Sequence, residues 1–146
     1  MASGRRATVA DRRWLRIVDA NLNRAREGLR VCEDVARLGY DDPQLTGDLK
    51  RVRHEVTAAG RRLPVSWRDL LAARGAERDV GRRFDSLTTP QRGTMQTLFI
   101  VNMQRAKEAL RVLEESCRWA APTVSRSWAR LRFRLYAIEA AFAQRG

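Results

Sequence analysis

The sequence has few of the residues that build disulfide frameworks or metal centres. It contains two cysteines, Cys32 and Cys117, and a single histidine, His54. The cysteines are far apart and each falls within a helical apolar pattern, so we interpret them as small core residues. His54 lies off the apolar stripe of its segment, which favours an exposed structural residue, with a role as a base as the alternative.

Long apolar runs and standard phosphate-binding loops are also missing. No stretch approaches the roughly 20 apolar residues of a membrane-spanning helix, and the short basic N-terminus is not followed by the apolar segment of a secretory signal. The sequence therefore predicts a cytoplasmic protein with no membrane partner. Neither G-x-x-x-x-G-K-[ST] nor G-x-G-x-x-G, the two common nucleotide-binding fingerprints, occurs in it.

Positive charge, in contrast, is abundant and is carried almost entirely by arginine. The chain has 29 basic and 17 acidic residues and a formal net charge of +12, yet its only lysines are Lys50 and Lys107. The planar guanidinium of arginine donates paired hydrogen bonds to the oxygens of phosphate and carboxylate groups, so we expect an anionic partner. The basic residues are spread along the chain rather than gathered in one recognition helix, which disfavours nucleic acid.

Apolar spacing predicts an all-α protein with four helical segments and no strand. Pro43 and Pro122 suit the first turn of the second and fourth helices, where no amide donor is needed. Thr88 or Thr89 is the expected N-cap of the third helix. The expected segments are residues 8–38, 43–63, 90–120 and 122–142.

The chain also repeats itself. Eight residues of the window 21–33 recur at an offset of 81 positions, and the second helices correspond at an offset of 79, from Pro43 to Pro122. The simplest architecture is a four-helix bundle of two helical hairpins related by a pseudo-twofold axis. We expect one domain over residues 1–146, with repeat one at about 8–63, repeat two at about 90–144, and between them a long connector at about 64–89 that is partly helical at 67–73. Connectors of this length are often functional.

Three polar residues fall on or beside the apolar face of the first helix. A projection at 100° per residue places Asn21 and Arg24 within the apolar arc and Glu27 at its edge. A buried arginine is costly unless it is paired. We interpret the set as a pocket for an anionic ligand inside the bundle, with a buried Arg–Glu network between the hairpins as the alternative. The equivalent residues in the second repeat are Asn102, Arg105 and Glu108.

Other charged residues extend this picture. Arg53 and Arg132 flank the core stripes of their helices and are expected to reach the same pocket. Asp79, in the connector, suits either a divalent cation or a plain turn. Four repeated charges are expected on the opposite, solvated face, with a subunit interface or a second ligand surface as the alternative: Arg30, Glu33, Arg111 and Glu114.

Two runs resemble a signature of the alternative hydroxymethylpyrimidine-phosphate kinase family of thiamine biosynthesis. They are residues 19–34, DANLNRAREGLRVCED, and residues 102–115, NMQRAKEALRVLEE. The segments 49–55, LKRVRHE, and 78–81, RDVG, are similar to the family as well. The resemblance covers about residues 18–142, and the two long runs are specific in combination.

The resemblance implies an ATP-dependent, Mg²⁺-assisted phosphoryl transfer to 4-amino-5-hydroxymethyl-2-methylpyrimidine phosphate, giving the diphosphate. Members are often fused to a thiamine-phosphate synthase, which would make that enzyme a functional partner. Applied to this chain, the implied phosphate-binding residues are the arginines Arg24, Arg53, Arg105 and Arg132. Asn21 and Asn102 would recognise the pyrimidine or orient a phosphate. The catalytic residues would be Glu27, Glu108 and Asp79, with Mg²⁺ bound by Asp79 and Glu108.

Three other readings remain open. A chorismate-mutase-like bundle also carries internal arginines but requires neither ATP nor metal. A non-catalytic module would bind a thiamine intermediate or a partner enzyme without turnover. A helical nucleic-acid binder would show steep salt dependence. The wide apolar arc of the first helix also allows a homodimer.

Overall fold

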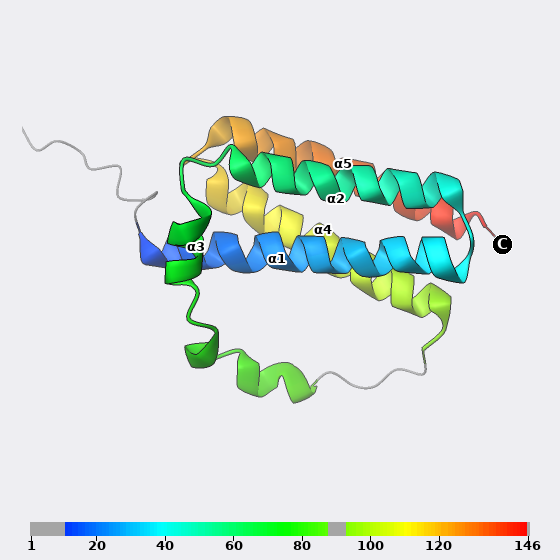
Figure 1. Cartoon of the computed structure of the whole chain (residues 1–146), viewed down its shortest axis with the longest axis horizontal. Helices are drawn as coiled ribbons and strands as arrows, with labels where there is room; N and C mark the ends of the chain where they lie inside the picture. Colours follow the sequence, from blue (N-terminus) through cyan, green and yellow to red (C-terminus); the bar gives the residue numbers. More distant parts are fainter. Residues whose placement is uncertain (1–10, 88–92, 146) are drawn as a thin grey trace, which may run out of the picture.

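The computed structural model describes residues 11–87 and 93–145, and within these ranges the protein is entirely helical. Five α-helices pack as a bundle without a strand in the described part of the chain, which confirms the predicted fold class (Figure 1). A π-helical turn, Val35–Gly39, continues the first helix, and short 3₁₀ turns follow the third. The helices are α1 (Arg12–Asp34), α2 (Pro43–Arg61), α3 (Trp67–Ala73), α4 (Met95–Cys117) and α5 (Pro122–Ala143).

The helix starts follow local capping chemistry. Asp42 caps α2 by accepting a hydrogen bond from the Leu45 amide at 3.0 Å, and Pro43 and Pro122 occupy first turns as predicted. The predicted start of the third helix at residue 90 is wrong. α4 begins at Met95 because the Thr94 hydroxyl accepts from the Thr97 amide at 3.0 Å and satisfies its first turn. The two predicted N-cap residues, 88 and 89, lie outside the described residues.

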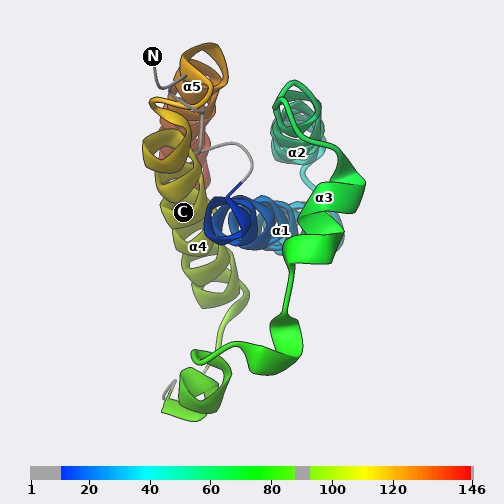
Figure 2. The same ribbon diagram turned by 90° about the vertical axis from the view of Figure 1, so that its left-hand side faces the viewer.

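The two hairpins pack through a crossing of their first helices. α1 and α2 run antiparallel, as do α4 and α5, and α4 crosses α1 while α2 contacts α5 (Figures 1 and 2). At the crossing the backbones approach closely. A Cβ atom added to Gly28 would lie 2.8 Å from the carbonyl oxygen of Asn102 and 3.4 Å from the Cβ of Ala106. Only glycine fits at this point of α1.

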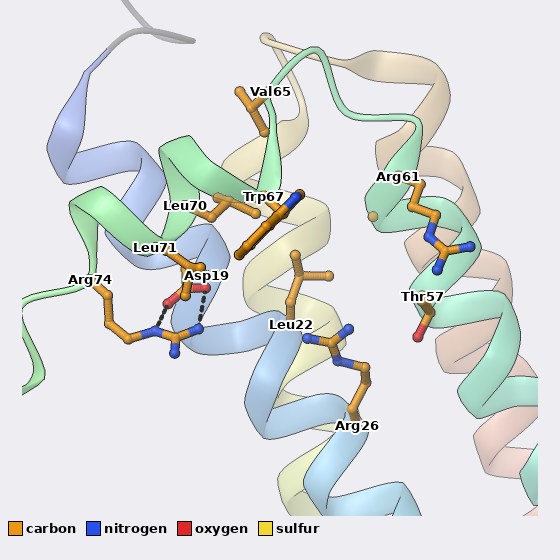
Figure 3. A pocket seen from close by; sticks show the side chains of 11 residues that line it. Asp19, Leu22, Arg26, Thr57, Arg61, Val65, Trp67, Leu70, Leu71 and Arg74 are labelled. Carbon is orange, nitrogen blue, oxygen red and sulfur yellow. Dashed lines mark hydrogen bonds and ion pairs between the residues drawn. The ribbon is translucent and has the colours of Figure 1, made fainter.

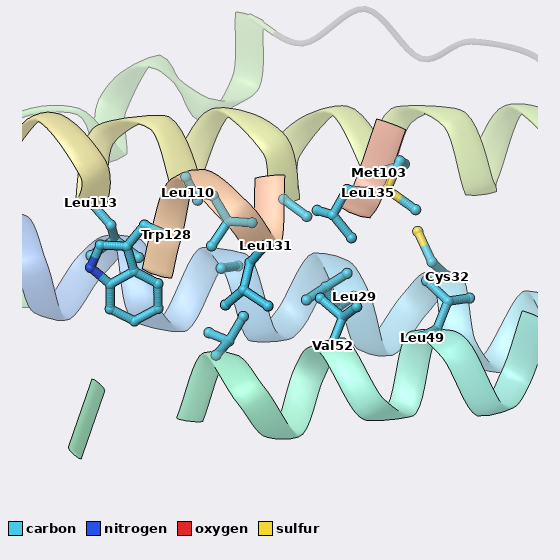
Figure 4. Packing of buried hydrophobic residues seen from close by; sticks show 14 of the residues in the cluster. Leu29, Cys32, Leu49, Val52, Met103, Leu110, Leu113, Trp128, Leu131 and Leu135 are labelled. Carbon is cyan, nitrogen blue, oxygen red and sulfur yellow. The ribbon is translucent and has the colours of Figure 1, made fainter. Parts of the chain in front are cut away.

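Apolar side chains of the four long helices interdigitate in one core (Figure 4). Equivalent positions of the two repeats both supply buried core residues, such as Leu49 and Trp128 or Val52 and Leu131, and all four are at most 4% exposed. Burial of each such side chain stabilises the fold by about 1.5–3 kcal/mol. Cys32 and Cys117 are fully buried in this core, as predicted.

The connector adds a small helix beside α1. α3 starts with a capping box in which Ser66 and Asp69 satisfy each other's backbone amides. At its other end, Arg74 donates two hydrogen bonds to the buried carboxylate of Asp19, at 2.7 and 2.9 Å, and so fixes α3 to α1. The predicted helical stretch at 67–73 is thereby confirmed. None of the described helices has an apolar segment long enough to cross a bilayer.

Candidate functional site

The arginines expected inside the bundle lie on its surface. Arg24 and Arg105 are exposed, and so are Glu27 and Glu108. The tight crossing at Gly28 leaves no room for a guanidinium between α1 and α4, and an unpaired buried arginine would be strongly destabilising. The predicted pocket in the bundle core is therefore wrong, although a ligand role for these residues on the surface stays a prediction.

The two asparagines are buried, as expected, but their amides bind the local backbone. Asn21 Nδ2 donates to the carbonyl oxygen of Ile17 at 2.8 Å, and Asn102 Nδ2 donates to that of Leu98 at 2.9 Å. Each amide thus satisfies a carbonyl one turn earlier in its own helix. The repeated asparagine has a structural explanation in both halves of the chain.

A buried ion pair recurs in both hairpins. Arg53 Nε donates to Glu33 Oε2 at 2.7 Å, and Arg132 Nε donates to Glu114 Oε2 at 3.0 Å. Glu33 and Glu114 are 3% and 9% exposed, so their predicted place on a solvated face is wrong.

The alternative of a buried Arg–Glu network is therefore half right. The network exists, but it joins the two helices within each hairpin rather than one hairpin to the other, and its glutamates are Glu33 and Glu114. Arg30 and Arg111, in contrast, are exposed as expected. The sequence contains a signal for these ion pairs, because both partners recur. Glu33 corresponds to Glu114 at the offset of 81 positions, and Arg53 corresponds to Arg132 at the offset of 79.

Two cavities lie side by side on the outside of α1. The first, which we call the α3 cavity, has a volume of about 510 Å³ between α1, α2 and α3 (Figure 3). The second, the connector cavity, has a volume of about 550 Å³ between α1 and residues 74–79. Asp19 and Arg74 line both cavities, so their ion pair forms the shared wall. The hydrogen bonds that Arg74 donates to the Asp19 carboxylate raise the pKa of Arg74, which keeps the wall charged.

The connector cavity gathers three of the predicted site residues: Asn21, Arg24 and Asp79. Arg13 and Arg16 line it too, and the internal repeat does not reveal them because both precede the repeated window. Asp79 Oδ1 accepts from the Gly81 amide at 2.9 Å, as expected for a turn residue, and a cation-binding role for Asp79 stays a prediction. With Arg74 on the shared wall, the cavity presents four guanidinium groups and suits a highly charged anion.

The remaining predicted residues are not brought to this place. Glu108 and Arg132 line a third cavity of about 490 Å³ between α4 and α5. Glu27, Arg53 and Arg105 line none of the three. In the described ranges no cluster of three or more histidine, cysteine or acidic residues is arranged to hold a metal ion, and Asp79 and Glu108 belong to different cavities.

The α3 cavity combines apolar and cationic walls. Leu22, Leu70 and Trp67 supply its apolar surface, while Arg26 lies one turn beyond Leu22 on α1 and Arg61 projects from α2 (Figure 3). The sequence gives one indication of this cavity, a tryptophan followed by two leucines in a connector helix too short to bury them.

Comparison with known proteins places the chain in a family. A model described as the ThiD2 family matches residues 16–141. The chain is 38% identical over 126 residues to a thiamine-phosphate synthase of Nostoc sp., covering 85% of this chain and 34% of that protein. It is 38% identical over 138 residues to a thiamine-phosphate synthase of Prochlorococcus marinus, covering 94% of this chain and 37% of that protein.

The alignments define how far the similarity extends. A thiamine-phosphate synthase of Synechocystis sp. is likewise 38% identical, over 124 residues that cover 85% of this chain and 34% of that protein. The chain thus spans about a third of the length of these relatives. No solved structure matches it. The chain belongs to the ThiD2 family.

Proposed function

We propose that this protein is a kinase of thiamine biosynthesis that transfers the γ-phosphoryl group of ATP to 4-amino-5-hydroxymethyl-2-methylpyrimidine phosphate. Membership of the ThiD2 family and relatives named thiamine-phosphate synthase support the pathway. The resemblance of residues 19–34 and 102–115 to the alternative hydroxymethylpyrimidine-phosphate kinases supports the reaction. Thiamine-phosphate synthase would be the functional partner.

The observation that carries the proposal is the arginine-rich connector cavity. Phosphoryl transfer depends on positioning and on stabilising charge at the phosphate oxygens more than on covalent catalysis. Arg16 and Arg24 on α1, with Arg74 held in place by Asp19, present guanidinium groups to one cavity. Such groups would bind phosphate oxygens at the point of transfer and offset the repulsion that these oxygens exert on one another.

The reaction needs no strong general base. The nucleophile is a phosphate oxygen of the pyrimidine monophosphate, which is largely deprotonated at pH 7 because its second pKa is about 6. This oxygen forms a bond to the γ-phosphorus while the bond to the leaving ADP breaks. Exposed Glu27 and Glu108 are therefore not required as proton acceptors, and their predicted catalytic roles are the weakest part of the set.

A magnesium ion would reach this site together with ATP. Mg²⁺ in kinases is commonly held by one or two carboxylates and by substrate phosphates, and it neutralises charge on those phosphates. Asp79 fits this need, because its carboxylate borders the cavity that contains Arg24. Glu108 does not fit it, since it lies in the cavity between α4 and α5.

Mass spectrometry tests the proposal directly. The purified protein is incubated with the pyrimidine monophosphate, ATP and Mg²⁺, and ADP and the pyrimidine diphosphate are expected in equal amounts. Arg24→Ala should lose most of the product, whereas Arg126→Ala, an exposed arginine on α5, should retain it. Folded protein that yields no diphosphate would contradict the kinase proposal, and turnover of chorismate without ATP would identify the mutase alternative.

A further inference from the structure

The pseudo-twofold symmetry allows the α3 cavity to be compared with the third cavity, which lies between α4 and α5 and is lined by Lys107 and Tyr136. There Lys107 on α4 pairs with Glu139 on α5, with 2.6 Å between Nζ and Oε2. The Lys107 ammonium also lies 5.2 Å from the centre of the Tyr136 ring, and its side chain is only 11% exposed. In the second hairpin the charge of Lys107 is therefore paired with Glu139, and its ammonium group lies against the Tyr136 ring.

The first hairpin lacks both of these partners. At the repeat offsets, Lys107 corresponds to Arg26, Glu139 to Gly60, and Tyr136 to Thr57. The acidic side chain is therefore replaced by a hydrogen atom, and the aromatic ring by a small hydroxyl. Gly60 also packs against Leu22, where a Cβ atom would lie 3.1 Å from Cδ2. The first hairpin keeps a cation in the groove without a carboxylate to pair with it.

A second cation strengthens the asymmetry. Arg61 stands in the first hairpin where Ala140 stands in the second. In the described part of the chain Arg26 bonds only to the Asn23 side chain, at 3.0 Å, and neither Arg26 nor Arg61 forms an ion pair there. Two guanidinium groups therefore line a cavity in which the described residues leave their charge unpaired.

Helix α3 covers this groove. It brings Trp67 to the cavity, where the indole lies between the Asp19–Arg74 pair and the Arg26 and Arg61 side (Figure 3). Trp67 is 67% exposed, so its ring is available to a ligand. An accessible indole beside cationic groups suits a flat ring that carries a negative charge.

We propose that the α3 cavity binds a planar heteroaromatic ring bearing a phosphate group, with the ring against Trp67 and the phosphate at Arg26 and Arg61. The identity of the ligand rests on the proposed function, which offers the pyrimidine monophosphate and the adenine nucleotide as sources of this chemistry. The position of the cavity agrees with either source. Only the Asp19–Arg74 pair separates it from the connector cavity, so a ligand here lies next to the second anion site.

Equilibrium binding without turnover tests this site. The pyrimidine monophosphate and Mg²⁺–ADP are titrated separately into the full chain by calorimetry, so that no phosphoryl transfer takes place. Trp67→Ala should weaken binding of one ligand by about 5- to 100-fold, as expected for loss of base stacking, and Arg26→Ala by about tenfold. Trp67→Phe should bind nearly as well as wild type, because the phenyl ring still stacks.

Trp119→Ala is the matched control. Trp119 is 86% exposed near the turn between α4 and α5 and lines none of the three cavities. Its removal should leave binding of both ligands unchanged. Circular dichroism would establish that each variant is folded, and Arg26→Ala keeps the test decisive should Trp67→Ala disturb α3.

The outcomes separate this inference from the proposed kinase. Loss of pyrimidine phosphate binding assigns the cavity to the acceptor, and loss of ADP binding assigns it to the nucleotide. Binding of both ligands that is insensitive to Trp67 and Arg26, or no binding of either ligand to wild type, overturns the proposal. Diphosphate formation that is unchanged in both variants would leave the kinase intact and refute this site. Ligand binding that depends on Trp67, in a protein that forms no diphosphate, would support this site and contradict the kinase proposal.

Discussion

Glu55 of α2 and Arg134 of α5 occupy equivalent positions of the two repeats, 79 residues apart, and their side chains meet in an ion pair at 2.6 Å. A residue that touches its own symmetry equivalent lies beside the pseudo-twofold axis, so this pair marks where the axis passes between the hairpins. Both side chains are at least 41% exposed, and such surface pairs contribute little to stability. The bundle depends instead on its buried contacts.

We expect the buried pair of Glu33 and Arg53 to be sensitive to removal of one partner. Glu33→Ala leaves a largely buried guanidinium without its carboxylate and should lower the free energy of unfolding by about 2–4 kcal/mol. Urea denaturation measures this change. Replacing both residues by leucine should recover most of the loss, because no charge is then left unpaired.

Arg30→Ala provides the control for that experiment. The Arg30 side chain is 54% exposed and forms a surface ion pair with Asp34, so its removal should change the free energy of unfolding by less than about 0.5 kcal/mol. If Glu33→Ala and Arg30→Ala had the same free energy of unfolding, the buried pair would not contribute measurably to stability.

The α1–α4 crossing predicts opposite effects of the same substitution at two glycines. Gly28→Ala should destabilise the protein by about 1–3 kcal/mol, because the new Cβ would press on the Asn102 carbonyl oxygen and force the helices apart. Gly47→Ala on α2 should stabilise it by up to about 1 kcal/mol, since alanine favours helix and the nearest atom is a flexible Arg51 guanidinium nitrogen at 3.5 Å. Thermal unfolding compares the two, and equal shifts would argue against the close crossing.

Arg24 and Arg105, which occupy equivalent positions of the two repeats, should contribute differently to catalysis. Arg24 lines the connector cavity, whereas its equivalent, Arg105, lines none of the three cavities. We expect Arg24→Ala to lower kcat/KM for the proposed kinase reaction by at least about tenfold and Arg105→Ala to have little effect. Steady-state assays over both substrates provide the measurement. Equal losses in the two variants would indicate that the site uses both halves of the bundle symmetrically.

The core cysteines should be chemically silent in the folded protein. Burial raises the pKa of Cys32 to about 12 and also raises that of Cys117, while the thiolate is the form that reacts. At pH 8 a disulfide reagent should therefore label both thiols only as fast as the protein unfolds. Fast labelling of native protein would contradict the core placement.

The same shift fixes the sign of the pH dependence. The folded state holds the Cys32 proton up to about pH 12, whereas the unfolded thiol releases it near 9.0. This contribution to stability is complete below pH 9 and is lost progressively as the pH rises toward 12. Wild type should therefore lose stability more steeply than Cys32→Ala between pH 8 and pH 10.5, as followed by urea denaturation.

Much of the fold could be predicted from the sequence, because helix periodicity and internal repetition are local signals. The apolar stripe, the prolines at 43 and 122 and the short helix at 67–73 were all placed from spacing alone. The start of α4 was not, since several threonines could cap a helix and only the three-dimensional structure selects Thr94.

The site was harder to predict, because a helical projection shows which residues share an apolar arc but not which helix packs against that arc. Asn21 and Arg24 lie within the same arc, yet one is buried and the other exposed, and the difference depends on how closely α4 approaches α1. Spacing along α1 predicts a solvated Glu33, because its partner Arg53 lies on another helix and does not enter the projection. The α3 cavity involves three helices, and spacing along one helix cannot reveal it.

The crossing of α1 with α4 also shapes how the chain is made. Gly28 lies about 80 residues before its contact at Ala106, and ribosomes add roughly 5–20 residues per second. The apolar crossing face of the first hairpin therefore emerges roughly 4–16 s before the helix that covers it. During each round of synthesis the nascent first half must remain free of other contacts until its matching half arrives.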